Sequence, residues 1–497
     1  MGKTALMSDG RLLAPGETCW RVERADRFAC VIDGADYFRR AKAAMLRAEG
    51  RILLVGWDFD TRILFERGGK SLPGPNVMGA FLRWIVRTRP GVNVYLLRSN
   101  VRLLPAFEGL WGRVTPVALL NWLNGDRLRF AIDGAHPVGA VPHQKIAVID
   151  DAFALCGGID FTIDRWDTRE HLPVNAHRRA IGRAYGPRHE VAVAVDGAAA
   201  RALGDQARDR WETATGFPLE PVDVAEANGD VWPRGLEPIL RGVDVAIART
   251  IPAYDGRDEV REVEALNLAA IAAARHTIYL ENQYLASRTL TDALVARLQE
   301  SDGPQIVVVM PRNSESRLEE HAMDSARYRL LHKLWAADSH QRFAVYWPVV
   351  GGGETPIYVH AKVMVIDDRL LRIGSSNLNN RSMGFDSECD VAIEALPDNP
   401  GHDHIRQAIV SVRDDLIGEH LGVPAAEVAD GVKLAGSLLG AVEALRGRGR
   451  ARTLLRFDEN TIADESSLLA ENDLMDPDRV PDSLPRSVQR WLRRLTE

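Results

Sequence analysis

The chain carries one short pattern twice, and this repeat constrains its fold more than any other feature. Residues 143–160 read HQKIAVIDDAFALCGGID, and residues 360–377 read HAKVMVIDDRLLRIGSSN. The two segments align without a gap, with His, Lys and Asp at the same positions and apolar residues in step. Such agreement indicates two copies of one structural unit within the chain.

Each copy predicts a β-hairpin. In the second copy, residues 363–366 form an apolar run, Asp367-Asp368 favours a turn, and residues 370–373 favour a return strand. Because side chains alternate along a strand, His360 and Lys362 project from one face, and the return strand brings Gly374 to Asn377 beside them. A lone His on an apolar strand is more often a hydrogen-bonded core residue. The same His and Lys in both copies favour a functional pair.

The motif His-x-Lys-x4-Asp, followed by Gly-Gly or Gly-Ser and present twice, resembles the phospholipase D superfamily. Four longer segments resemble its branch of bacterial and eukaryotic phospholipases D: residues 136–168, PRHE at 187–190, IYLENQYL at 278–285 and NLNNRSMGFDSE at 377–388. The similarity covers roughly residues 45–425. It implies an α/β fold of two similar lobes, each a mixed β-sheet flanked by helices. A pseudo-two-fold axis would relate the lobes around one shared active site.

The order of predicted elements repeats along the chain. RILLVGWDF at 51–59 corresponds to TIYLENQYL at 277–285, and the later strands at 92–97 and 306–311 also correspond. We therefore expect a first lobe over residues 1–216, a proline-containing linker over 217–242 and a second lobe over 243–425. Residues 426–497 form a C-terminal extension. Its apolar helical stretch and following arginines fit either an anionic membrane surface or a helix packed on the second lobe.

The paired motifs suit attack on a phosphodiester. Negative charge develops on the non-bridging oxygens during attack, and Lys145, Lys362 and Asn377 would stabilise it. An ammonium group two residues from each His stands where a second cation would sit, so no metal and no other cofactor is expected. The resemblance implies that His143 attacks phosphorus and that His360 acts as the acid. The near-symmetry of the two motifs does not itself choose between them.

Further residues are predicted to support this chemistry. Glu388 matches the carboxylate that the family uses to orient a catalytic His, and Asp167 is the nearest analogue in the first lobe. Asp150 and Asp367 lie at turns, in a structural or a catalytic role. The predicted substrate contacts are Gly157, Gly158, Ser375, Ser376, Asn282 and Trp347. Phe107, Trp111 and Trp122 fit either an apolar rim over the site or the packing of a small helical insertion. Asp160 replaces the commoner Asn, and GGID is a form of the phospholipase branch.

Composition narrows the substrate class. The formal net charge is −7, whereas nucleic-acid binders usually carry a basic face, so no nucleic-acid partner is expected. The four cysteines are widely spaced and fit free thiols. No apolar signal-peptide core is recognised, so a cytoplasmic location with peripheral membrane contact is expected. The resulting prediction is hydrolysis of glycerophospholipids to phosphatidic acid, with phosphatidyl transfer, nuclease activity or non-catalytic lipid binding as alternatives. Head group and oligomeric state are not determined by the sequence.

Overall fold

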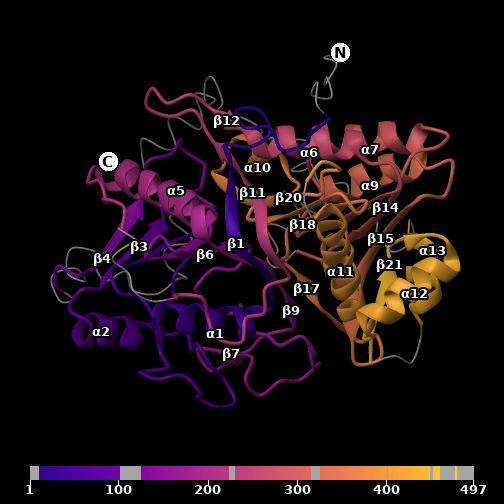
Figure 1. Ribbon diagram of the computed structural model, residues 1–497. Helices are drawn as coiled ribbons and strands as arrows, with labels where there is room; N and C mark the ends of the chain where they lie inside the picture. Colours follow the sequence, from indigo (N-terminus) through magenta and orange to yellow (C-terminus); the bar gives the residue numbers. More distant parts are fainter. Residues whose placement is uncertain are drawn as a thin grey trace, which may run out of the picture.

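The computed structural model describes residues 10–100, 125–222, 230–314, 325–399, 401–447, 451–458 and 476–477. The predicted rim residues Phe107, Trp111 and Trp122 lie outside these ranges. Helices flank a large mixed β-sheet, which confirms the α/β prediction (Figure 1).

The first half of the chain builds one wing of this sheet. Its order is β4-β3-β2-β5-β6-β10-β1, in which β2, β3 and β4 are parallel and the remaining pairs are antiparallel. The elements are β1 (Arg21–Ile32), α1 (Gly34–Met45), β2 (Arg51–Gly56), α2 (Met78–Thr88), β3 (Asn93–Ser99), β4 (Leu128–Asp133), β5 (Ile146–Ile149), β6 (Phe153–Gly157), β10 (Val191–Asp196) and α5 (Gly197–Thr215).

The second half repeats this arrangement in the order β11-β20-β19-β18-β13-β14-β15. Its elements are β11 (Leu240–Ile251), α6 (Glu262–Ala273), β13 (Thr277–Glu281), α7 (Arg288–Gln299), β14 (Gln305–Val309), α9 (Ser325–Ala337), β15 (Phe343–Val350), β18 (Val363–Ile366), β19 (Leu370–Gly374), α10 (Asn380–Gly384), β20 (Glu388–Glu394) and α11 (His402–Leu421). Strands β1 and β11 pair antiparallel in the middle, so the strand order reads alike from either end. This arrangement is the predicted pseudo-two-fold.

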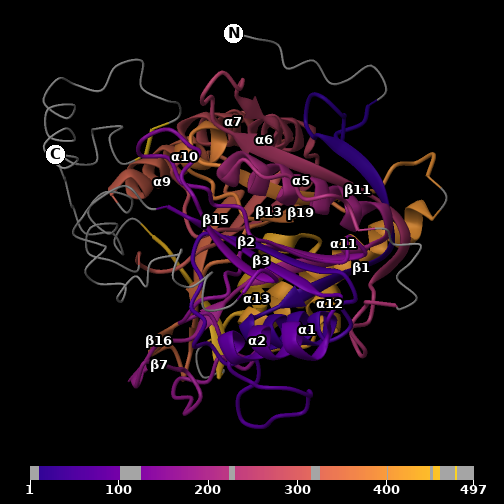
Figure 2. The ribbon, with the colours of Figure 1, turned by 90° about the vertical axis from the view of Figure 1, so that its left-hand side faces the viewer.

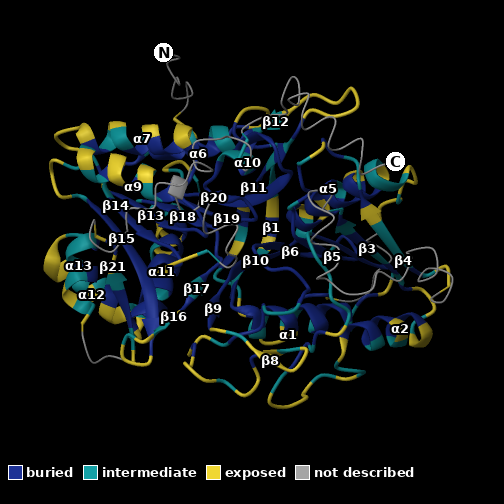
Figure 3. Cartoon of the chain, turned by 180° about the vertical axis from the view of Figure 1, so that it is seen from behind, coloured by how far each residue is buried: buried dark blue, intermediate teal, exposed yellow. Residues whose placement is uncertain are grey.

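Three apolar cores hold the layers together. One lies under α1 and α2 and includes Phe38 and Phe81; another lies under α6 and α7 and includes Leu266. The third joins both halves, with Leu203 from α5 and Leu416 from α11. Figures 1 and 2 place α1 and α2 on the opposite side of the molecule from α6 and α7. Figure 3 shows buried strands between helices whose outer faces are exposed, which explains the continuous apolar runs in the sequence.

The C-terminal extension packs on the second half. Helices α12 (Ala425–Ala435) and α13 (Leu438–Leu445) are followed by strand β21 (Arg452–Arg456), which pairs with β15. The helical stretch of this extension is therefore followed by a strand that the sequence did not predict. Arg446 and Arg456 form ion pairs with Glu443, at 2.5 and 3.4 Å. Among the residues with described positions, no helix is both long and apolar enough to cross a bilayer.

The segment predicted as a linker is partly buried. The Trp232 ring packs against Phe153 at a centroid distance of 5.6 Å, and its indole N–H donates to the carbonyl oxygen of Leu236 at 2.7 Å. Strand β11 begins at Leu240, inside the predicted linker range. The connection is thus packed onto the first half where it is described.

Candidate active site

The two motif hairpins have the predicted register. In the second hairpin Val363 lies opposite Ile373, and the amide of Gly374 donates to the carbonyl oxygen of Lys362 at 3.2 Å. In the first hairpin the amide of Gly157 donates to the carbonyl oxygen of Lys145 at 3.4 Å. The residues that follow each return strand therefore lie beside the Lys of the same motif.

Both histidines lie where the two halves of the chain meet. Strand β17 (Tyr358–Val359) pairs parallel with β9 (Arg188–His189), and the amide of His360 donates to the carbonyl oxygen of His189 at 2.9 Å. In the symmetric position, the amide of His143 donates to the carbonyl oxygen of Ser387 at 2.9 Å. Each His is therefore fixed by backbone from the opposite half.

The carboxylates that orient the two imidazoles also come from the opposite halves. Nδ1 of His143 lies 3.1 Å from both Oε1 and Oε2 of Glu388. Nδ1 of His360 lies 2.9 Å from Oε2 of Glu190. Because Nδ1 is engaged in both rings, Nε2 is the atom that each ring can offer to a substrate. The two halves exchange carboxylates, so neither half holds a complete His–Glu pair.

Two buried lysines complete the centre. Nζ of Lys145 donates to the carbonyl oxygen of His143 at 2.9 Å and lies 3.3 Å from Oδ2 of Asp160. Nζ of Lys362 donates to the carbonyl oxygen of His360 at 2.6 Å and to Oε1 of Gln283 at 3.3 Å. Ammonium groups held in this way can stabilise an anionic substrate as negative charge develops on it.

Burial sets the protonation of the site. Burial and the charges of Lys145 and Lys362 hold the pKa of His143 well below its usual value. Burial and the charge of Lys362 do the same to the pKa of His360. Burial also lowers the pKa of Lys362 to about 7 and raises the pKa of Glu388 to about 8. Both imidazoles are thus neutral near pH 7 in the ligand-free protein, which is the form a nucleophile requires.

Comparison with known proteins agrees with this geometry. A family model described as the cardiolipin synthase PLD-like domain matches residues 268–406. The chain is 24% identical over 471 residues to phospholipase D A of Dictyostelium discoideum, covering 79% of this chain, and 24% identical over 259 residues to phospholipase D of Phytophthora infestans, covering 42%. The chain belongs to the phospholipase D superfamily. It spans only 35% and 14% of the lengths of these two phospholipase D relatives.

A solved structure has a similar fold. The crystal structure of phosphatidylserine synthase from Haemophilus influenzae Rd KW20 superposes with a TM-score of 0.53 at 14% sequence identity. The match covers 79% of this chain and 86% of the synthase chain. At this identity the match supports the two-lobed architecture.

The structure corrects the assignment of Asp167. Its Oδ2 lies 3.0 Å from Nδ1 of His171 and 3.1 Å from the Arg178 guanidinium, so it contacts neither motif His. The first-half carboxylate is Glu190, which directly precedes β10 as Glu388 opens β20. The signal was present in PRHE, one of the segments that resemble the phospholipase D superfamily.

The motif aspartates brace strands and do not enter the site. Asp150 accepts hydrogen bonds from the amides of residues 49, 50 and 51 at 2.7, 2.8 and 2.6 Å. Asp367 accepts from the amides of residues 275, 276 and 277 at 2.9, 2.8 and 2.7 Å. Each Asp therefore accepts hydrogen bonds from the backbone amides that lead into β2 or β13. Of the two roles left open by the sequence, the contacts are those of the structural one.

Several predicted substrate contacts instead hold the site together. The hydroxyl of Ser375 donates to Glu388 at 2.5 Å, and the hydroxyl of Ser376 donates to Asp390. Oδ1 of Asn282 accepts from the amide of Leu378 at 3.0 Å. These three side chains hold other residues of the site in position.

The remaining predicted contacts divide in the same way. A side chain at Gly157 would collide with Ala192, so this glycine serves packing, and Trp347 packs in the second-half core against Phe457. A Cβ at Gly158 would lie 3.1 Å from the carbonyl oxygen of His360, so this glycine borders the catalytic centre. The Oδ1 atom of Asn377 is buried and has no hydrogen-bond partner among the residues whose positions are described.

Sequence reasoning missed two arginines near His360. Arg165 and Arg188 are buried and lie 3.8 and 3.9 Å from Oε1 of Glu190. The guanidinium of Arg188 lies over the Tyr358 ring at 4.7 Å. Both arginines fall inside segments that resemble the superfamily, which was the available signal. They make the surroundings of His360 more cationic than those of His143.

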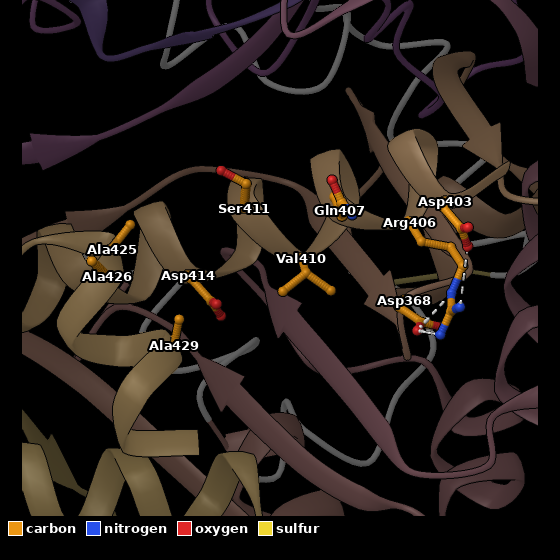
Figure 4. Close-up of a pocket in the computed structure, with 10 residues that line it drawn as sticks. All are labelled: Asp368, Asp403, Arg406, Gln407, Val410, Ser411, Asp414, Ala425, Ala426 and Ala429. Atoms are coloured by element: carbon orange, nitrogen blue, oxygen red, sulfur yellow. Dashed lines mark hydrogen bonds and ion pairs between the residues drawn. The ribbon is translucent and has the colours of Figure 1, made fainter. Parts of the chain in front are cut away.

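A surface pocket lies elsewhere, between α11 and α12. Figure 4 shows Arg406 paired with Asp368 and Asp403 at one end of this pocket. Neither motif His lines this pocket. The chemistry is therefore assigned to the junction of the two halves.

Proposed function

We propose that the chain is a phosphodiesterase that hydrolyses the head-group phosphodiester of glycerophospholipids to phosphatidic acid and a free alcohol. The observation that carries this proposal is the pair of imidazoles, each held by a Glu of the opposite half and accompanied by a buried Lys. Relatives named phospholipase D support the lipid substrate. Access to such a substrate requires peripheral contact with a membrane surface.

In the first step, Nε2 of His143 attacks phosphorus, and the bond from phosphorus to the head-group oxygen breaks. His360, protonated at Nε2, gives its proton to the leaving oxygen. Lys145 and Lys362 stabilise the charge on the non-bridging oxygens. The cationic surroundings of the free site disfavour protonated His360. A bound phosphodiester is anionic, and its negative charge favours the protonated form.

In the second step, His360 takes a proton from the acceptor, whose oxygen attacks the phosphohistidine. The phosphorus–nitrogen bond breaks and His143 leaves as the neutral imidazole. With water as acceptor the product is phosphatidic acid. With an alcohol it is a phosphatidylalcohol. The scheme uses no metal and no cofactor.

Phosphatidyl transfer is the second candidate, because the matching family model is described as a cardiolipin synthase domain. Side-chain exposure of 14% at His143 and 7% at His360 also limits the entry of bulk water. Nuclease activity on the same scaffold is disfavoured by the net charge of −7.

The test incubates the protein with mixed phospholipid vesicles and, separately, with single-stranded and duplex DNA. Release of choline or ethanolamine with intact DNA supports the proposal, whereas cleaved DNA with intact lipid refutes it. Ethanol added to the vesicles should yield phosphatidylethanol, detected by mass spectrometry, together with acid-labile phosphate on the protein. Active hydrolysis with neither signal would exclude the phosphohistidine step. Transfer without hydrolysis would favour the second candidate.

A further inference from the structure

A second group of titratable side chains lies behind the catalytic pair. Asp33, His171, His189 and Glu419 are 1%, 0%, 0% and 5% exposed, and the catalytic steps use none of them. The first three belong to the first half of the chain, whereas Glu419 comes from α11 of the second half. Charged side chains on a protein surface are far more exposed than these four.

The atoms of these four residues converge on one point. Oε1 of Glu419 lies 2.8 Å from Nδ1 of His189 and 3.0 Å from Nε2 of His171. The carboxylate of Asp33 lies 3.6 Å from Nε2 of His171 and 3.5 Å from Nδ1 of His189. A tetrahedral ion with bond lengths of about 2.0 to 2.2 Å separates its ligand atoms by roughly 3.3 to 3.6 Å. The two Asp33 separations lie in that range, whereas the two Glu419 separations are hydrogen-bond distances that would lengthen when an ion replaces the shared protons.

The outer nitrogen of each imidazole is bound as in a metal site. Nδ1 of His171 lies 3.0 Å from Oδ2 of Asp167, and Nε2 of His189 lies 2.9 Å from Oε2 of Glu281. A histidine that binds a metal almost always donates its other ring N–H to such a group, which fixes the tautomer. This arrangement leaves Nε2 of His171 and Nδ1 of His189 directed at the shared point.

An unsatisfied atom provides independent evidence for a ligand. Oδ2 of Asp33 is buried and accepts no hydrogen bond from the part of the chain that the structure describes. A buried carboxylate oxygen without a donor is costly, and a cation at the shared point would satisfy it.

We propose that Asp33, His171, His189 and Glu419 bind one zinc ion in a closed, structural site. Two imidazole nitrogens and two carboxylate oxygens form a ligand set that zinc accepts, and four protein ligands leave no position for a substrate. The alternative occupant is a pair of protons that makes both imidazoles cationic. One divalent ion replaces those protons without changing the net charge, so zinc binding should release protons to solvent.

A neighbouring trio, His189, Glu281 and His420, is a weaker candidate. It offers only three ligands, and Glu281 already accepts hydrogen bonds from the Tyr279 hydroxyl at 2.5 Å and from His420 at 2.9 Å. Glu281 therefore acts as the outer partner of His189.

The proposed ion would connect the two halves next to the catalytic centre. Its ligand His189 accepts the backbone hydrogen bond from His360 and directly precedes Glu190. Its ligand Glu419 anchors α11 of the opposite half. Zinc at this point would thus stabilise the lobe junction on which the His360–Glu190 pair depends.

The test measures metal content in the purified full chain by inductively coupled plasma mass spectrometry, without an affinity tag that binds metal. We expect one zinc per chain, loss of zinc in His171→Ala, and retention in the control His332→Ala, an exposed His on α9. Removal with a chelator should lower the melting temperature, and zinc alone should restore it with release of protons. Cobalt(II) in the emptied site should give the intense visible absorption of tetrahedral coordination.

The proposal is overturned if the folded wild-type chain contains no stoichiometric zinc and binds none in equilibrium dialysis. Zinc retained at full stoichiometry in folded His171→Ala would also overturn it. If His171→Ala fails to fold, X-ray absorption of the zinc-loaded wild type decides the question. Two imidazole nitrogens with carboxylate oxygens support the site, whereas a sulfur-containing or imidazole-free shell refutes it.

Discussion

Replacing Glu388 with Gln should separate the orientation of His143 from the folding of the protein. The two carboxyl oxygens of Glu388 receive three donors: Nδ1 of His143 and the hydroxyls of Ser375 and Ser382, the last two at 2.5 and 2.7 Å. An amide has one acceptor oxygen in place of two, so Glu388→Gln cannot serve all three donors. Where the amide NH2 faces His143, the proton moves to Nε2 and the nucleophilic lone pair is lost.

The expected loss is large. Replacing the carboxylate partner of a catalytic His lowers kcat by a factor on the order of 10³ to 10⁴ in enzymes with a Ser-His-Asp triad. At about 1.36 kcal/mol per factor of ten, this is roughly 4 to 5.5 kcal/mol of transition-state stabilisation. The assay is nitrophenolate release from bis(4-nitrophenyl) phosphate, which tests phosphodiester chemistry without assuming a lipid.

The same substitution, Glu388→Gln, should not lower the stability of the fold although it lowers kcat. Burial raises the pKa of Glu388 to about 8 from 4.5, so the folded chain binds more protons than the unfolded chain between these values. The contribution of this group to stability is complete below pH 4.5 and is lost as pH rises through 8. Glu388→Gln should therefore leave the melting temperature at pH 7 unchanged or higher, and should flatten its decline across this window.

Glu394→Gln is the matched control on the same strand. Glu394 is bonded to the Leu12 amide at 3.0 Å and to Arg369 at 2.6 Å, and no contact links it to His143. This variant should lose stability and keep kcat. A Glu388→Gln enzyme within ten-fold of wild-type kcat would refute the orientation argument, as would an equal loss of kcat in the control.

Three further outcomes follow from the geometry. His143→Ala and His360→Ala should each lower kcat by at least about 10³, with the double variant no worse; half the activity in each single variant would refute a shared site. Asp150→Asn and Asp367→Asn should each cost about 1.5 to 3 kcal/mol in urea unfolding with kcat retained, because each loses an amide partner; a selective loss of kcat would contradict their bracing role. The kcat/KM profile should fall as pH rises through about 7, where Lys362 loses its proton, and a limb near pH 10 would argue against that assignment.

Local sequence was sufficient wherever the structure depends on neighbours along the chain. The apolar runs and turn residues after His143 and His360 predicted both hairpins, and the side-chain period of a strand placed Lys145 and Lys362 beside the two histidines. The turn aspartates were likewise readable as braces. The repeat itself indicated two similar halves, because each copy of the motif supplies one His and one Lys.

The partners of each imidazole were decided by tertiary structure. His143 and Glu388 lie 245 positions apart, and His360 and Glu190 lie 170 apart. Asp167 was the nearer carboxylate in sequence, but the packing of the halves directs it to His171 and brings Glu190 to His360. The sequence could not show whether Trp347 packs in the core or contacts a ligand, because aromatic residues of both kinds have apolar neighbours along the chain. The contacts of these side chains depend on which faces meet when the two halves pack. Spacing along the chain does not predict that packing.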